Sequence, residues 1–160
     1  MRVHIEPARP ADLPALIELL ALLFAIEQDF HPDVDRQRRG LELLLAQPAE
    51  QARIFVARRD DAPQDVVGMV SAQLVISTAS GAPSAWLEDL VVRAACRGQG
   101  LGRQLLDAAM AWALARGARR VQLLADADNQ PALDVYRHLG WQPTRLFAWR
   151  QFPGAPARHE

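Results

Sequence analysis

One stretch of the chain decides how the rest is interpreted: Val91-Val92-Arg93-Ala94-Ala95-Cys96-Arg97-Gly98-Gln99-Gly100-Leu101-Gly102-Arg103. An apolar strand runs into a polar loop with three alternate glycines, and the loop opens a helix. The first N–H groups of a helix lack partners and carry partial positive charge, and glycines let a phosphate approach without a Cβ in the way. The stretch therefore predicts a phosphate-binding loop. A tight turn that needs glycine only for its dihedral angles is the alternative.

Two other phosphate-binding loops do not fit this stretch. The dinucleotide fingerprint G-x-G-x-x-G needs a glycine where the chain has Arg103. All 18 basic residues are arginines, so the lysine of a nucleoside-triphosphate loop is missing, as is any Schiff-base lysine. The spacing that does fit is R-x-x-G-x-G, at Arg97, Gly100 and Gly102.

In its context this spacing resembles the GNAT superfamily of acetyl-CoA-dependent N-acetyltransferases. After the next strand the chain carries Asn129, Tyr136 and Gly140-Trp141 at the offsets that the family shows. The resemblance is clear over residues 86–149 and weaker but compatible over residues 2–77. It implies a mixed sheet whose fourth and fifth strands splay apart, with acetyl-CoA as cosubstrate in the gap. The cosubstrate-binding residues it implies are Val91, Val92, Arg97, Gly98, Gln99, Gly100, Leu101, Gly102, Arg103, Asn129 and Tyr136.

The periodicity of apolar residues predicts the order β-α-α-β-β-β-α-β-α-β. This order indicates one α/β (α+β) domain over residues 1–152, in which helices cover both faces of a mixed sheet of six to seven strands. Residues 153–160 are expected to form a flexible tail. The expected strands are 2–6, 53–58, 66–77, 85–92, 120–125 and 141–152, and the expected helices are 12–28, 35–47, 101–115 and 131–139.

Two polar residues of the last third have both a functional and a structural interpretation. Tyr136 is the only tyrosine of the chain. The resemblance makes it the general acid that protonates the departing CoA thiolate; the alternative is a core aromatic with a satisfied hydroxyl. Asn129 lies just before Pro131, so it is expected to cap a helix, to bind the pantetheine arm of the cosubstrate, or to do both.

Two adjacent carboxylates interrupt the apolar strand 85–92. Burial would raise the pKa of such a group towards a value that suits a general base, and neighbouring strand residues face opposite sides. The resemblance favours Glu88 as the base that accepts the amine proton, directly or through water. Asp89 is either an acceptor-binding residue or a structural carboxylate paired with an arginine. In the family, backbone amides near Val91 and Val92 polarise the thioester.

The break between the first two helices is expected to bind the acceptor. It contains Glu27, Asp29 and Phe30, and the combination of acid and aromatic suits a cationic amine; an ordinary solvated loop is the alternative. The predicted function is direct transfer of acetyl from acetyl-CoA to a primary amine, a small cationic molecule. Protein or peptide N-acetylation, a non-catalytic acyl-CoA sensor and a protein-interaction domain remain the alternatives.

Composition excludes several other classes of function. The net charge of −1 argues against a nucleic-acid partner. With one cysteine, Cys96, and no H-x-H or H-x-x-x-H spacing, neither a metal site nor an internal disulfide is expected. No histidine lies near Cys96 in the sequence, so a nucleophilic cysteine is not favoured. The single cysteine suits a reducing compartment, so a cytoplasmic protein is expected. The most apolar stretch, residues 13–26, is too short to span a bilayer comfortably. Frequent alanine and arginine suggest a bacterial source, and a homodimer remains open.

Overall fold

The computed structural model describes residues 2–27 and 30–154, and the chain divides into two compact units, residues 1–126 and residues 127–160. The first unit holds a five-stranded sheet and most of the helices. Its elements are β1 (Val3–Pro7), α1 (Leu13–Ile26), α2 (Val34–Ala46), β2 (Ala52–Arg59), β3 (Val66–Ser77), β4 (Ala82–Val92), α3 (Leu101–Ala115) and β5 (Arg120–Leu123), with short 3-10 turns at Pro10–Asp12 and Ala94–Cys96. The second unit contains α4 (Gln130–His138).

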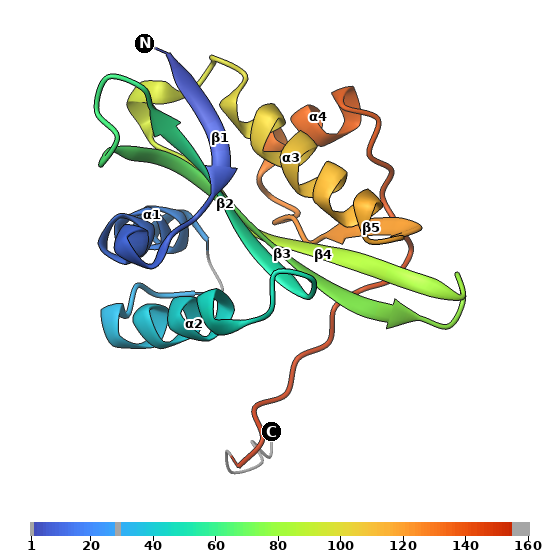
Figure 1. Ribbon diagram of the computed structural model, residues 1–160. Helices are drawn as coiled ribbons and strands as arrows, with labels where there is room; N and C mark the ends of the chain where they lie inside the picture. Colours follow the sequence, from blue (N-terminus) through green and yellow to red (C-terminus); the bar gives the residue numbers. More distant parts are fainter. Residues whose placement is uncertain (1, 28–29, 155–160) are drawn as a thin grey trace. The chain divides into compact units, whose positions relative to one another are not determined.

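The strands lie in the order β1-β2-β3-β4-β5, with antiparallel pairs from β1 to β4 and a parallel pair between β4 and β5. Helices α1 and α2 cover one face of this sheet and α3 covers the other (Figure 1). The expected mixed sheet with helices on both faces is therefore confirmed. Within the described residues, no helix is both long and apolar enough to cross a bilayer.

The hydrophobic core between α1, α2 and the sheet explains why these segments are helices and strands. Leu16 and Leu20 of α1 recur at helical spacing and meet Met69 and Val91 of the central strands, all of them buried. Helix α2 starts one residue earlier than the sequence predicts, because the side chain of Asp33 accepts a hydrogen bond from the backbone N–H of Arg36 at 3.0 Å and so acts as the N-cap.

The prediction of six to seven strands was wrong, because the sheet of the described residues has five. Residues 141–152, expected as the last strand, form no strand, although Leu146, Phe147 and Trp149 give this stretch a strand-like composition and are more than four-fifths exposed. A strand needs a neighbour to take its hydrogen bonds, and Pro143 has no N–H to donate. The described residues of the second unit contain α4 but no strand that could serve as this neighbour.

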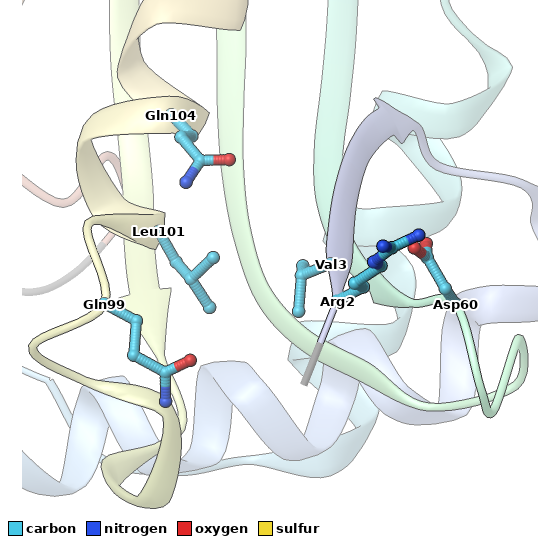
Figure 2. A pocket seen from close by; sticks show the side chains of 6 residues that line it. All are labelled: Arg2, Val3, Asp60, Gln99, Leu101 and Gln104. Atoms are coloured by element: carbon cyan, nitrogen blue, oxygen red, sulfur yellow. The ribbon is translucent and has the colours of Figure 1, made fainter.

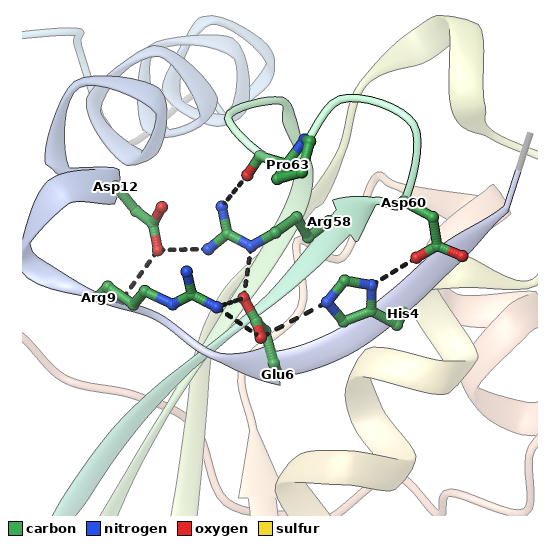
Figure 3. A network of polar contacts seen from close by, with 7 residues as sticks. All are labelled: His4, Glu6, Arg9, Asp12, Arg58, Asp60 and Pro63. Carbon is green, nitrogen blue, oxygen red and sulfur yellow. Dashed lines mark hydrogen bonds and ion pairs between the residues drawn. The ribbon is translucent and has the colours of Figure 1, made fainter.

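A buried guanidinium group connects the first strand, the first turn and β2. Arg58 is 3% exposed and donates to the carboxylates of Glu6 and Asp12, at 2.7 Å in the latter case, and to the carbonyl of Pro63 at 2.6 Å (Figure 3). Partial burial acts to raise the pKa of Glu6, but its ion pairs with Arg58 and Arg9 outweigh burial and lower this pKa below its usual value. The shape of guanidinium lets it serve all three acceptors at once.

We expect Arg58→Lys to lower the free energy of unfolding by about 1–3 kcal/mol, because an ammonium group cannot reproduce the planar fork and leaves buried acceptors without good partners. Arg59→Lys is the matched control, since the neighbouring Arg59 is one-third exposed and pairs with Asp61 and Asp65 at the surface. We expect the control to change stability by less than about 0.5 kcal/mol. Urea denaturation at pH 7 measures both variants, and equal losses would contradict the role given to Arg58.

Candidate active site

The site begins where β4 and β5 part. The two strands pair only from Ser84–Arg120 to Leu87–Leu123, whereas β4 continues to Val92, so its edge beyond Leu87 has no strand partner on that side among the described residues. The N–H of Arg93 donates to the carbonyl of Val67 at 2.8 Å, towards β3. Because N–H directions alternate along a strand, the N–H of Val92 faces the side of β5. The gap is therefore lined by an unpaired backbone edge.

The glycine-rich loop carries this edge directly into the N-terminus of α3. Gly98 and Gly100 have φ angles of 75° and 74°, in the left-handed region that glycine adopts without strain. Gly102 does not have a positive φ, and a Cβ added there would meet nothing within 4 Å. No side chain in the described part of the chain caps α3, unlike α2 and α4, so its first N–H groups are available to an anion.

Two arginines flank this loop. The Nε of Arg97 donates to the carbonyl of Val92 at 3.0 Å, which fixes the loop against the end of β4. Arg103 lies one turn before Asp107, with 3.6 Å between Nε and the nearest carboxylate oxygen. Gln99 is exposed, whereas Leu101 anchors the start of α3 in the core. Cys96 is a free and buried cysteine, and such burial is typical of a structural thiol rather than a reactive one.

A shallow cavity of about 330 Å³ adjoins the loop on the side of α3 that faces β1 (Figure 2). Two amide side chains, two apolar side chains, an arginine and a carboxylate line it: Arg2, Val3, Asp60, Gln99, Leu101 and Gln104. Because β1 and β5 are opposite edges of the sheet, this cavity is separate from the gap between β4 and β5.

Asp89 sits in a β-bulge at the start of the unpaired edge. Ser71 pairs with Glu88 and Met69 with Val91, so two residues of β4 lie opposite Val70 alone. Asp89 has a φ of 57° and is the only non-glycine residue with positive φ in the described chain. Such strained backbone clusters at functional sites, and aspartate tolerates this conformation better than most residues.

The bulge gives the two adjacent carboxylates different surroundings. Glu88 is exposed and makes no side-chain hydrogen bond or ion pair with the described residues. The pKa of Asp89 is raised to about 6, chiefly by burial and next by the negative charge of Glu88, against the hydrogen bond that Ser71 donates at 3.3 Å. No arginine in the described part of the chain forms an ion pair with Asp89, so the structural alternative from the sequence is not what the structure shows.

Helix α1 places a further carboxylate near this pair. Glu18 of α1 and Arg93, which directly follows β4, form an ion pair at 2.8 Å. The charge of Glu27 contributes, as the smallest of the named causes, to the raised pKa of Asp89.

Of the other residues expected to bind the acceptor in the break between α1 and α2, the structure describes Phe30. Phe30 is 43% exposed, and its ring centroid lies 5.4 Å from that of Phe24. Asp29 lies outside the described residues. The role of this break in acceptor binding stays a prediction.

The second unit contains the other two residues expected in the site. The Oδ1 of Asn129 accepts a hydrogen bond from the N–H of Ala132 at 3.3 Å, which confirms that Asn129 caps α4. Tyr136 lies on α4 with its ring 6.0 Å from that of Trp141, and its carbonyl accepts from the N–H of Trp141 at 2.9 Å. The chain therefore turns at Gly140-Trp141 after α4, and this turn places the ring of Trp141 against the ring of Tyr136.

Ser71 was missed by the sequence analysis. It is 1% exposed, and its hydroxyl donates to the carboxylate of Asp89 and to the carbonyl of Glu88. The signal was a polar residue inside the apolar strand 66–72, which indicates a specific partner when the strand is buried. Over the described residues, no group of histidine, cysteine and acidic side chains could hold a metal ion.

Comparison with known proteins assigns the family. The sequence matches the model of the acetyltransferase (GNAT) family over residues 16–141, so the chain belongs to this family and is an acyltransferase. It is 28% identical over 156 residues to aminoglycoside N(6')-acetyltransferase type 1 of Stenotrophomonas maltophilia, covering 96% of this chain and 95% of that protein. A second relative, mycothiol acetyltransferase of Beutenbergia cavernae, is 39% identical over 57 residues, 36% of this chain but 19% of that protein's length.

The fold agrees with this assignment. The structure of a putative acetyltransferase from Agrobacterium tumefaciens superposes with a TM-score of 0.76 at 28% sequence identity, covering 92% of this chain and 99% of that one. The family resemblance expected from the Arg97–Gly102 spacing is therefore confirmed.

Proposed function

We propose that the protein transfers the acetyl group of acetyl-CoA directly to the primary amine of a small cationic molecule. The observation that carries the proposal is the uncapped N-terminus of α3 at the end of the unpaired edge of β4. Membership of the acetyltransferase family supports acetyl-CoA as the cosubstrate, and the aminoglycoside acetyltransferase relative supports a small amine as the acceptor.

The cosubstrate is bound by backbone groups in this proposal. Its pyrophosphate lies against the N–H groups at the start of α3, where the helix dipole and the absence of a Cβ at Gly102 favour a phosphate. The flanking guanidinium groups of Arg97 and Arg103 add positive charge. The pantetheine arm follows the edge of β4, and the N–H of Val92 stabilises the oxyanion that forms on the thioester carbonyl.

Asp89 is the general base of the proposed reaction, in place of Glu88. The neutral amine attacks the carbonyl carbon, a C–N bond forms, and the proton of the resulting ammonium passes to the Asp89 carboxylate, directly or through water. A base with a pKa of about 6 is ionised at neutral pH and still matched to this transfer. Exposed Glu88 and neighbouring Glu27 supply negative charge that attracts a cationic acceptor.

Collapse of the tetrahedral intermediate breaks the C–S bond. The electron pair leaves with sulfur, and the Tyr136 hydroxyl donates a proton to this thiolate, giving free CoA and the acetylated amine. Tyr136 receives this role by its offset from Asn129 and from the glycine loop. Solvent then exchanges protons with both side chains and restores the resting state.

Gly102→Ala tests the proposed cosubstrate site. We expect acetyl-CoA to bind about tenfold more weakly, because the added methyl group occupies the approach of the pyrophosphate. The fold should be unharmed, since Gly102 is helical and has open space at its Cβ position. Isothermal titration calorimetry and a melting curve measure both quantities.

Gly40→Ala is the matched control, because Gly40 is also a helical glycine with no atom near its Cβ position but lies in α2. It should leave the affinity for acetyl-CoA unchanged. Gly100→Ala should instead lower stability, because alanine is strained at a φ of 74°. Unchanged affinity in Gly102→Ala would contradict the assignment of the loop.

A further inference from the structure

Ser71 is a buried hydroxyl group that contacts the strained part of β4 at two points. It is 1% exposed and lies on β3, directly opposite Glu88 in the strand register. Its Oγ lies 3.2 Å from the carbonyl oxygen of Glu88 and 3.3 Å from Oδ2 of the Asp89 carboxylate. One hydroxyl therefore contacts both the peptide group that precedes Asp89 and the end of the Asp89 side chain.

These two contacts support a backbone conformation that is costly by itself. A left-handed non-glycine residue persists only where its surroundings hold it, and Asp89 has a φ of 57°. Within the described residues, no hydrogen bond other than that of Ser71 reaches the Asp89 carboxylate. The direction in which this carboxylate points therefore depends on one hydroxyl group and on packing.

A single hydrogen atom serves the two acceptors. A serine hydroxyl donates one hydrogen bond, and an ionised carboxylate is a stronger acceptor than a neutral carbonyl. While Asp89 is ionised, its carboxylate is therefore the preferred partner of Ser71. When Asp89 takes up a proton this preference is lost, and the carbonyl of Glu88 is available at nearly the same distance. The buried hydroxyl thus has an acceptor in both protonation states.

We propose that Ser71 is a positioning residue for acetyl transfer: it holds Oδ2 of ionised Asp89, so that Oδ1 receives the proton of the acceptor amine, and it turns to the Glu88 carbonyl once Asp89 is neutral. This inference rests on the proposed function, in which Asp89 is the base. Ser71 itself neither gains nor loses a proton.

The charges around Asp89 explain why such a residue is needed. Burial, the adjacent Glu88 on β4 and, as the smallest contribution, Glu27 after α1 all raise the pKa of Asp89, whereas the hydrogen bond from Ser71 lowers it. Because this hydrogen bond stabilises the ionised carboxylate, Ser71 favours the form of Asp89 that can act as a base.

The pH dependence of Ser71→Ala tests this role. Without the hydroxyl, the pH below which protonation of Asp89 limits kcat/KM should move from about 6 to about one pH unit higher. Above this pH, kcat should fall by about tenfold because the carboxylate is less well directed, while KM for the amine changes little. The measurement is CoA release with the best acceptor from a screen of primary amines.

Ser84→Ala is the matched control. Ser84 is a serine of β4 that is 0% exposed, and its hydroxyl donates to the carbonyl of Arg120 at 3.2 Å, five residues from Asp89 along the strand. Its loss should lower the melting temperature as Ser71→Ala does, but leave kcat and the pH dependence unchanged. Equal changes of the pH dependence in the two variants would overturn the inference.

Two further variants separate positioning from packing. Ser71→Thr keeps a hydroxyl and should restore the pH dependence of the wild type; a folded Ser71→Thr that behaves like Ser71→Ala would overturn the inference. In a protein that already carries Asp89→Asn, Ser71→Ala should lower kcat no further, because Ser71 acts through the Asp89 carboxylate. Additive losses of kcat would contradict this.

A titration that needs no turnover keeps the two proposals apart. Carbon-13 NMR of the Asp89 side-chain carboxyl group follows its ionisation directly, and in Ser71→Ala it should titrate about one pH unit higher than in the wild type. The same titration in both proteins would overturn the inference whether or not CoA is released. If the titration moves as expected but no primary amine releases CoA, the proposed function is overturned, and the role of Ser71 in catalysis with it.

Discussion

Asp89→Asn is expected to lower kcat by about 10²–10⁴, the range typical of a positioned general base. Asparagine has nearly the same shape, tolerates a positive φ and can still accept the hydrogen bond of Ser71, but it cannot take a proton from the amine. The measurement is steady-state CoA release at saturating acetyl-CoA with the best acceptor found.

Glu88→Gln is the matched control for the choice of base. Glu88 is the adjacent carboxylate and has no hydrogen-bond partner among the described residues, so we expect kcat to fall by less than tenfold and KM for a cationic amine to rise. The reverse result, with kcat abolished by Glu88→Gln and kept in Asp89→Asn, would return the role of base to Glu88.

The pH dependence of the wild type gives a second readout. Amines are mostly protonated below pH 9, so log kcat/KM rises with a slope of about one as the neutral amine becomes available. Below about pH 6 Asp89 must also lose its proton, and the slope should approach two. In Asp89→Asn the slope should stay at one throughout.

Asp89→Asn should also stabilise the protein at neutral pH. The pKa of Asp89 is raised in the folded state above the unfolded value, so the folded state binds this proton more tightly. Its contribution to stability is present below about pH 4 and is lost as the pH rises through about 6. The ionised group therefore costs roughly 2–3 kcal/mol at pH 8, and its removal should raise the melting temperature while it lowers kcat.

Tyr136→Phe is expected to lower kcat by about 10²–10⁴ as well, provided that the chemical step limits the rate. The substitution removes one oxygen and keeps the ring that packs on Trp141. Affinity for acetyl-CoA should change little, because the hydroxyl is needed only when charge develops on the departing sulfur. A kcat and a melting curve for the same variant measure the two effects.

A purely structural tyrosine predicts the opposite pattern. A hydroxyl satisfied in the core would cost about 1 kcal/mol of stability when removed and leave turnover nearly intact. Full activity with a lowered melting temperature would therefore exclude Tyr136 as the general acid. Thiols with lower pKa leave more readily, so an acyl donor with such a leaving group should restore part of the lost rate if the catalytic role is right.

The sequence predicted the fold closely where local signals are strong. The strand 66–77 and the helix 101–115 both follow from the periodicity of apolar residues. The last strand was wrong, since pairing depends on a neighbour that no local pattern reveals. Thr144, Leu146 and Trp149 have the composition of a strand, and composition alone does not supply hydrogen-bond partners.

The site was predicted less completely, and the bulge in β4 is the reason. A regular strand lets the sequence say only that Glu88 and Asp89 face opposite sides, and nothing local marks which one is buried. The left-handed backbone at Asp89 and the hydroxyl of Ser71, eighteen residues earlier, depend on how β3 and β4 are paired. Such long-range pairing is what the sequence analysis lacked.

The bulge in β4 also limits what an alignment of relatives can transfer. The additional residue opposite Val70 changes the phase of β4, so residues before and after it follow different inside–outside patterns. A relative without the bulge would align Glu88 and Asp89 in the same columns yet bury the other member of the pair. Two enzymes of this family can therefore share the letters Leu-Glu-Asp-Leu and use different carboxylates, and only the strand register tells them apart.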